Sequence, residues 1–386
     1  MLQTAKKYWR NQKHCVIILA RTMCNGRKCV RMSRVQKLFD EVKLADRQAV
    51  LITKPSNIFY LSGYTGEGCL LLSKGVQAII TDFRYTEQAE RQAPGFSVHM
   101  IKTGVSHMDL AYSLMQGEGI DTLLYEDDEF TVRSFEKTKS VMQGITFESL
   151  KNAPEKVREV KDEGEIALIE EACDITSRAF DWLLGELKPG MTEIEARLKL
   201  DFKMLELGGD GLAFDTIVAS GENGSLPHAI PGQRKFQTGD MITFDFGAKK
   251  GGYCADMTRT VALGQPKDEM RRIYGIVLEA QEACEALLAP GKNCRDIDKV
   301  ARDIIDNAGY KGRFGHGLGH AVGIDIHESP RLSPACDALL VPGNTMTVEP
   351  GIYVPGLGGV RIENTCVITS NGGRTLVHAP KDLVIL

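Results

Sequence analysis

Two acidic residues in the C-terminal half of the sequence flank a short glycine-containing segment. Asp245 and Asp256 lie on either side of Lys249-Lys250-Gly251-Gly252. If Lys250-Gly251 forms a two-residue hairpin turn, Asp245 lies opposite Asp256 on one face of the ribbon. Carboxylates that face each other repel unless a cation lies between them, and hard oxygen ligands of this kind suit Mn²⁺, Mg²⁺ or Zn²⁺. This pair therefore predicts a divalent-metal site.

A second acidic pair repeats the arrangement about 100 residues later in the chain. Glu349 and Glu363 are separated by the glycine-rich segment 355–359, which predicts another hairpin that brings two carboxylates together. One acidic residue at the end of a strand is usually solvated and has no function. Two pairs in two hairpins favour a metal centre instead.

A histidine cluster accompanies the acidic pairs. Four of the eight histidines fall within 100 residues, and they are His228, His316, His320 and His327. Neutral imidazole binds metals beside carboxylates, and it also titrates near physiological pH. A lone histidine is more often structural, but this cluster can supply both a metal ligand and a proton donor.

The first part of the chain alternates short apolar runs with turns and helical stretches, which predicts an α/β domain. We expect strands at 49–53, 59–61, 69–72, 78–80, 122–125 and 146–149, and helices at 86–92 and 106–116. Pro154 and the charged run 156–165 then break the pattern. We place a domain boundary near residue 155.

The second part begins with a helix over residues 166–184, where apolar residues recur at helical spacing. Thr192 and Glu195 form a capping-box pattern that starts the next helix. Beyond it the sequence predicts an antiparallel, strand-rich half with helices near 268–288 and 294–308. The predicted fold class is therefore α/β, in the α+β arrangement.

These features resemble the pita-bread metallopeptidases, in particular their Xaa-Pro branch of aminopeptidase P and prolidase. Segments 57–64 and 81–85 resemble the creatinase-type N-terminal domain of that branch. The resemblance covers residues 32–386 and implies a creatinase-type domain over 32–155. It also implies a pita-bread catalytic domain over 156–386, with an antiparallel sheet and flanking helices.

The resemblance also implies a five-ligand site for two divalent metals. In such a site Asp256 and Glu363 bridge both ions, Asp245 chelates one, and His320 and Glu349 complete the other. We expect Mn²⁺, with Co²⁺ and Zn²⁺ as alternatives.

The same resemblance assigns the residues that handle substrate. Glu349 is implied as the general base, whereas His228 and His327 hold the tetrahedral intermediate and pass a proton to the leaving nitrogen. His316 is implied to shape the pocket for proline.

The activity implied is that of aminopeptidase P, which releases the N-terminal residue from Xaa-Pro peptides. Xaa-Pro dipeptidase activity is the alternative. Arg331, four residues after His327, is either a solvated or ion-paired charge, or a clamp for the free carboxylate of a dipeptide. A non-catalytic interaction protein is the third possibility, but such a protein is expected to lose ligands, and all five are present.

Composition limits the cellular setting and the partners. The ten cysteines form no CxxC pair, which favours a reducing compartment and a cytoplasmic location. No apolar stretch approaches the ~20 residues of a membrane-spanning helix. Outside the first 31 residues, 39 basic residues face 51 acidic ones, which disfavours nucleic acid as a partner. We expect proline-containing peptides as substrates, no membrane partner, and a homodimer.

Residues 1–31 differ from the rest because they contain eight Lys or Arg residues and no acidic residue. They are compatible with a transit peptide, with a nucleic-acid-binding arm, or with upstream sequence that precedes a natural start at Met32. They lack apolar periodicity and match nothing in the family, so we expect this basic leader to be disordered.

A chain that begins at Met32 should therefore have the same melting temperature and full activity. Thermal unfolding and peptidase assays of the two chain lengths test this expectation. A melting temperature several degrees lower in the shorter chain would show that the leader packs on the body.

Overall fold

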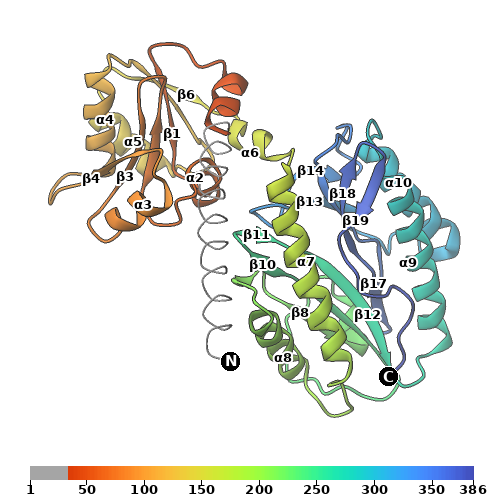
Figure 1. Ribbon diagram of the computed structural model, residues 1–386. Helices are drawn as coiled ribbons and strands as arrows, with labels where there is room; N and C mark the ends of the chain where they lie inside the picture. The colour runs from red at the N-terminus through yellow and green to blue at the C-terminus, as the bar shows by residue number, and fades with distance from the viewer. Residues whose placement is uncertain (1–33) are drawn as a thin grey trace, which may run out of the picture. The chain divides into compact units, whose positions relative to one another are not determined.

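The computed structural model describes residues 34–386, so the predictions for residues 1–31 lie outside the described part (Figure 1). The chain divides into two compact units, the first ending at Val157 and the second running from Arg158 to Leu386. Within residues 34–386, no helix has the length and apolar character needed to cross a membrane.

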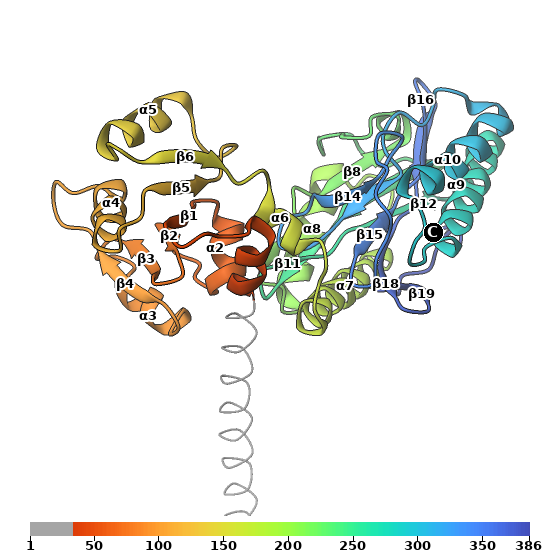
Figure 2. The same ribbon diagram turned by 90° about the horizontal axis from the view of Figure 1, so that it is seen from above.

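The first unit is a six-stranded mixed sheet with strand order β4-β3-β2-β1-β5-β6. Its strands are β1 (Gln48–Ile52), β2 (Cys69–Leu72), β3 (Gln77–Thr81), β4 (Ser97–Met100), β5 (Thr122–Tyr125) and β6 (Thr146–Ser149). Residues 34–42 are helical, followed by α2 (Pro55–Ser62), α3 (Thr86–Gln92), α4 (His107–Gly117), α5 (Val132–Val141) and α6 (Ala153–Arg158). Figure 2 shows α4 and α5 on one side of the sheet and α2 and α3 on the other. The predicted α/β character of this part is confirmed.

One predicted strand of this unit is wrong, because residues 59–61 belong to helix α2. Pro55 occupies the first turn, where its missing N–H costs no helical hydrogen bond. Gly63 ends the helix in the left-handed conformation, at φ 80°, and its N–H donates to the Phe59 carbonyl at 2.7 Å. A three-residue apolar run does not distinguish strand from helix, whereas the flanking proline and glycine do.

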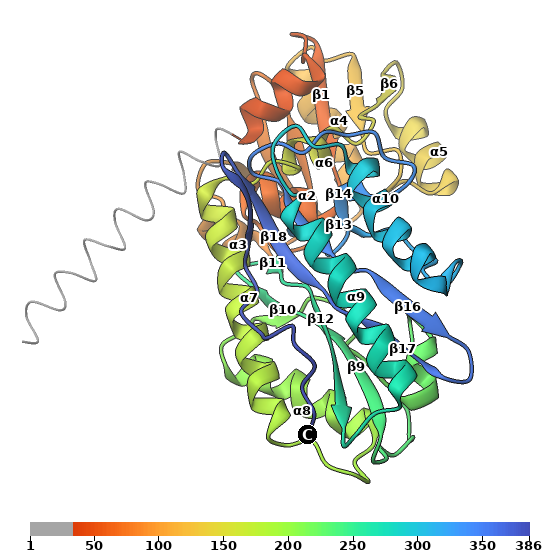
Figure 3. The ribbon, with the colours of Figure 1, turned by 90° about the vertical axis from the view of Figure 1, so that its right-hand side faces the viewer.

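The second unit places antiparallel strands between two pairs of helices. The helices are α7 (Glu163–Leu184), α8 (Glu193–Glu206), α9 (Asp268–Ala286) and α10 (Cys294–Ile305), with short turns η1 (Gly221–Ser225) and η2 (Asp306–Tyr310). Figures 1 and 3 show α7 and α8 on one side of the strands and α9 and α10 on the other. The capping box of α8 is present, since Glu195 N–H donates to Thr192 Oγ1 and Thr192 N–H donates to Glu195 Oε2.

The strands of the second unit pair only antiparallel with one another, as predicted. They are β7 (Gly211–Leu212), β8 (Ile217–Ser220), β9 (Asp240–Phe246), β10 (Ala248–Lys250), β11 (Tyr253–Cys254), β12 (Met257–Leu263), β13 (Gly319–Ala321), β14 (Glu328–Leu332), β15 (Thr345–Val348), β16 (Gly351–Val354), β17 (Gly358–Arg361), β18 (Asn364–Thr369) and β19 (Gly372–Thr375). The largest sheet has the order β14-β13-β15-β18-β19. Buried residues of α9 and α10, such as Val277 and Ile297, share one apolar core with Met346 of that sheet.

The first acid-bearing hairpin has a different register from the one predicted. Asp245 lies opposite Thr258 rather than Asp256, and Lys250 pairs with Tyr253. The turn is Gly251-Gly252, with φ of 57° and 86°, and a tight hairpin of this kind needs positive φ at both positions. Lysine at the first turn position would be strained there, so the turn lies one residue later in the chain. Asp256 consequently falls in the gap between β11 and β12.

The second acid-bearing hairpin is confirmed. Gly351 pairs with Arg361 in β16–β17, and Val348 pairs with Asn364 in β15–β18. Both ladders have the same register, and continuing it across the gap between them places Glu349 opposite Glu363.

The backbone crossing next to Asp245 generates a stability prediction. A Cβ atom on Gly247 would lie 1.9 Å from the Ala255 carbonyl oxygen, so Gly247→Ala should lower the free energy of unfolding by roughly 2 kcal/mol or more. Gly275, within α9, has open space around its Cβ direction, so Gly275→Ala should stabilise by about 0.5–1 kcal/mol. Chemical denaturation of both variants tests this pair. A Gly247→Ala protein as stable as the parent would contradict the close approach.

Candidate metal centre

Three carboxylates from different parts of the second unit meet in one place. Asp245 on β9, Asp256 before β12 and Glu363 before β18 each offer an oxygen, and these oxygens lie within 4.8 Å of one another. Asp256 is 5% exposed and Glu363 only 1%. Burial, and then the neighbouring carboxylates, raise the pKa of both groups well above the ordinary value. A cation between the three side chains would relieve this repulsion.

Hydrogen bonds occupy only one oxygen on two of these carboxylates. Asp245 Oδ2 accepts from Arg361 Nη2 at 2.6 Å, and Glu363 Oε2 accepts from Thr258 Oγ1 at 2.7 Å. The other oxygens, Asp245 Oδ1 and Glu363 Oε1, are buried without a hydrogen-bond partner among residues 34–386. Leaving a buried acceptor unsatisfied costs about 1–3 kcal/mol, and more for a charged group. The donor set therefore fits a divalent cation, which would satisfy both oxygens.

His320 and Glu349 lie next to the three carboxylates. His320 Nε2 is 3.3 Å from Glu349 Oε1 and 3.6 Å from Asp256 Oδ2. His320 Nδ1 lies 3.1 Å from the Ala321 carbonyl oxygen, and a proton on Nδ1 leaves Nε2 with a lone pair for a metal. When no metal is bound, burial opposes ionisation of Glu349, but the hydrogen bond and charge of a protonated His320 bring the pKa of Glu349 below the ordinary value. The structure thus brings together the five residues that sequence analysis selected.

A buried polar network connects His316 to this centre. His316 Nε2 lies 2.9 Å from the Tyr353 hydroxyl, which also accepts a hydrogen bond from Arg361 Nη1 at 2.9 Å. Arg361 in turn donates to Asp245. Burial lowers the pKa of His316, so its ring is neutral at pH 7.

Sequence analysis missed Tyr353, Arg361 and Thr258. Arg361 and Thr258 each lie two residues from a predicted ligand, Glu363 and Asp256. The alternation of a strand places such neighbours on the same face, and this signal could have selected both residues.

The other two predicted histidines are exposed. The His327 ring lies edge-on to His320, with 4.5 Å between ring centroids. Burial, and then the charges of His320 and Arg331, lower the pKa of His327. The charge of His228 also lowers the pKa of both His316 and His327, which places His228 near them.

Arg331 lies on β14 directly opposite His320 on β13. Residues that face each other in an antiparallel pair project their side chains from the same face of the sheet. Arg331 is exposed. Its guanidinium therefore emerges on the face that carries a predicted metal ligand.

A buried carboxylate cluster with an adjacent histidine, held by hairpins between two helix pairs, is typical of a metal-binding protein. Residues 167–370 match the family model of Metallopeptidase family M24, and residues 31–160 match that of the Creatinase/Prolidase N-terminal domain. The chain belongs to metallopeptidase family M24, and the predicted family and pita-bread fold class are confirmed.

Relatives match the chain over almost its whole length. The uncharacterized peptidase YqhT of Bacillus subtilis is 41% identical over 92% of this chain and 100% of its own. An Xaa-Pro dipeptidase structure from Bacillus anthracis has a TM-score of 0.88 and 39% identity, covering 92% of this chain and 100% of its own. An X-Pro aminopeptidase structure from Thermotoga maritima has a TM-score of 0.84 and 36% identity, covering 90% and 100%.

Asp256→Asn should abolish metal binding and nearly all peptidase activity, because it removes charge from the centre of the cluster. Metal at 100 times its dissociation constant should stabilise the parent by about 2.7 kcal/mol, and the variant should lose this gain. Metal content and the melting temperature with and without Mn²⁺ test both points. Asp303→Asn is the matched control, because Asp303 is an exposed residue of α10. Parent-like metal content and activity in Asp256→Asn would contradict the site.

Proposed function

We propose that this protein is a dinuclear metallopeptidase that cleaves Xaa-Pro bonds and prefers Xaa-Pro dipeptides. The position of Arg331 opposite His320 supports the preference. A dipeptide offers a free carboxylate beside the scissile bond, where a guanidinium can bind it bidentately. A longer peptide has an amide in that place. The sequence alone favoured aminopeptidase P. Because Arg331 lies opposite His320, we propose the dipeptidase alternative instead.

Aminopeptidase P activity remains the second candidate. The Thermotoga maritima relative named an X-Pro aminopeptidase is almost as similar to this chain as the Bacillus anthracis protein named an Xaa-Pro dipeptidase. A purely non-catalytic role is disfavoured because all five predicted ligands lie together.

We assign two divalent cations to the buried cluster. Asp245, Asp256 and Glu363, with His320 and Glu349 beside them, would hold these ions. The carboxylate-rich donor set favours Mn²⁺ over softer metals. When bound, such a pair supplies Lewis acidity and an activated water near neutral pH.

The remaining chemistry falls to side chains of this chain. Glu349 accepts the proton of the attacking water, because a carboxylate is ionised near neutral pH. His228 and His327 donate hydrogen bonds to the developing oxyanion and pass a proton to the leaving nitrogen. That transfer is essential because the nitrogen can leave as a neutral amine only after it gains a proton.

We assign His316 to the wall of the proline pocket. Its ring is neutral and fixed through Tyr353, so it presents a rigid and uncharged surface to the pyrrolidine ring. The homodimer expected from the sequence stays a prediction.

Arg331→Ala tests the substrate length. If Arg331 binds the free carboxylate, kcat/KM for an Xaa-Pro dipeptide should fall by about 2 kcal/mol, or roughly thirtyfold. Values for Xaa-Pro-Xaa tripeptides and tetrapeptides should change little. Arg374→Ala is the matched control, because Arg374 forms an exposed ion pair with Glu170 on the surface. Equal losses for all lengths would exclude the clamp, and a parent that prefers longer peptides would favour aminopeptidase P.

A further inference from the structure

A short turn connects β13 to β14 and carries one of the substrate-handling residues proposed above. Residues 322–327 form this turn, His327 is its last residue, and Glu328 begins β14. Arg331 follows three residues after Glu328. Glu328 thus lies between His327 and Arg331, and its side chain points away from solvent, with only 7% exposed.

The Glu328 carboxylate is bound by two cations from the start of the second unit. Glu328 Oε2 accepts from Lys161 Nζ at 2.9 Å, and Oε1 pairs with Arg158 Nη2 at 2.5 Å. Arg158 also binds Asp325 Oδ2 at 2.9 Å. The Arg158 and Lys161 side chains are 2% and 1% exposed. The charged run that suggested a domain boundary therefore contributes two buried cations.

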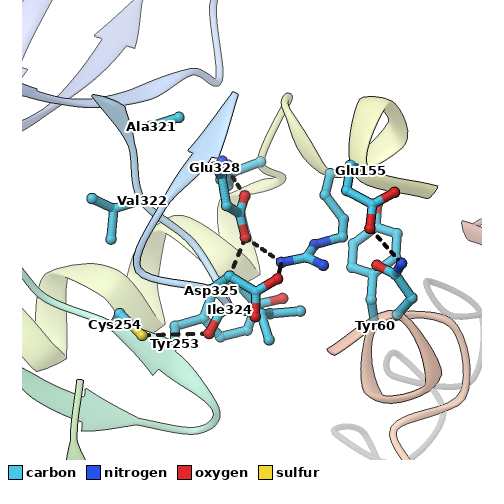
Figure 4. Close-up of polar contacts among 12 residues, drawn as sticks. Tyr60, Glu155, Tyr253, Cys254, Ala321, Val322, Ile324, Asp325 and Glu328 are labelled. Carbon is cyan, nitrogen blue, oxygen red and sulfur yellow. Dashed lines mark hydrogen bonds and ion pairs between the residues drawn. The ribbon is translucent and has the colours of Figure 1, made fainter. Parts of the chain in front are cut away.

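The turn itself is closed around this carboxylate. The N–H of Asp325 donates to Glu328 Oε1 at 3.1 Å, and Asp325 and Glu328 lie close together in Figure 4. A Cβ atom on Gly323 would lie 2.5 Å from both Glu328 carboxylate oxygens, so a larger residue there would displace this carboxylate. On its other side, the turn is held by Cys254, whose N–H donates to Gly323 O at 2.8 Å and whose thiol donates to Ile324 O at 3.3 Å.

Stability alone does not account for the three buried charges of this network, Arg158, Lys161 and Glu328. Removing two cations and one carboxylate from water is costly, and well-packed apolar residues often replace buried ion pairs without loss of stability. Charged groups differ from apolar ones because their directional bonds allow only one geometry. That geometry determines where His327 and Arg331 lie relative to His320.

We propose that Glu328, held by Lys161 and Arg158, is a positioning residue that fixes the turn bearing His327 and the strand bearing Arg331. The consequence for catalysis rests on the proposed function of those two residues. The metal ligands are held by other contacts, so this ion network should control substrate handling and leave metal binding unchanged.

Amide hydrogen exchange of the full-length protein tests positioning without any activity measurement. Glu328→Gln and Lys161→Met should each speed exchange in residues 322–328 about tenfold, with the rest of the second unit unchanged. Lys161→Arg, which keeps the charge, should stay within about threefold of the parent. Lys299→Met is the matched control, since Lys299 forms an exposed pair with Asp303 on α10.

The same variants should show about a tenfold or greater loss in kcat/KM for an Xaa-Pro dipeptide, with kcat lowered, KM raised and metal content unchanged. If Glu328→Gln does not fold, the Lys161 variants carry the test, because Glu328 then keeps Arg158. Amide hydrogen exchange at the parent's rate in both Glu328→Gln and Lys161→Met would overturn the proposal. Faster exchange over the whole second unit, accompanied by loss of metal, would also overturn it. A parent without Xaa-Pro activity would refute the proposed function and leave the exchange test of positioning intact.

Discussion

Repulsion among Asp245, Asp256 and Glu363 is the interaction around which the second unit is organised. Three acidic groups with oxygens within 4.8 Å of one another raise the free energy of the folded chain unless a cation or protons neutralise them. Each comes from a different strand end, so the fold must hold all three against this force. The paired hairpins and the flanking helix pairs provide that rigidity, because ladder hydrogen bonds leave the strand ends little freedom.

Neighbouring polar side chains then decide which carboxylate oxygens stay available. Thr258 binds one oxygen of Glu363 and Arg361 binds one oxygen of Asp245, which leaves the second oxygen of each carboxylate without a hydrogen-bond partner among residues 34–386. Thr347 orients two further candidate ligands. Its hydroxyl donates a hydrogen bond to Glu349 Oε1 and accepts one from the backbone N–H of His320. These neighbours orient the ligands much as outer-shell hydrogen bonds do in metalloenzymes generally.

The unit contains two sets of charged residues that differ in net charge. The carboxylate cluster has an excess of negative charge, which creates affinity for cations. The set of Arg158, Lys161, Asp325 and Glu328 is balanced, so its charges are satisfied within the chain and fix a turn instead. A metallopeptidase needs both kinds of set. The negative cluster holds cations, and the balanced set holds the substrate-binding residues at a constant distance from those cations.

The sequence by itself determined the four candidate acidic ligands, the histidine cluster, the second hairpin and the α8 capping box, because residue type and local spacing carry those signals, whereas the family resemblance selected His320 from that cluster. The tertiary structure alone decided the register of the first hairpin, where the positive φ of Gly251 and Gly252 moved Asp256 into a gap between strands. It also decided the burial of Arg158 and Lys161, whose partner Glu328 lies 170 and 167 residues away. Contacts at such separations leave no local pattern, since they exist only after the helices and strands have packed.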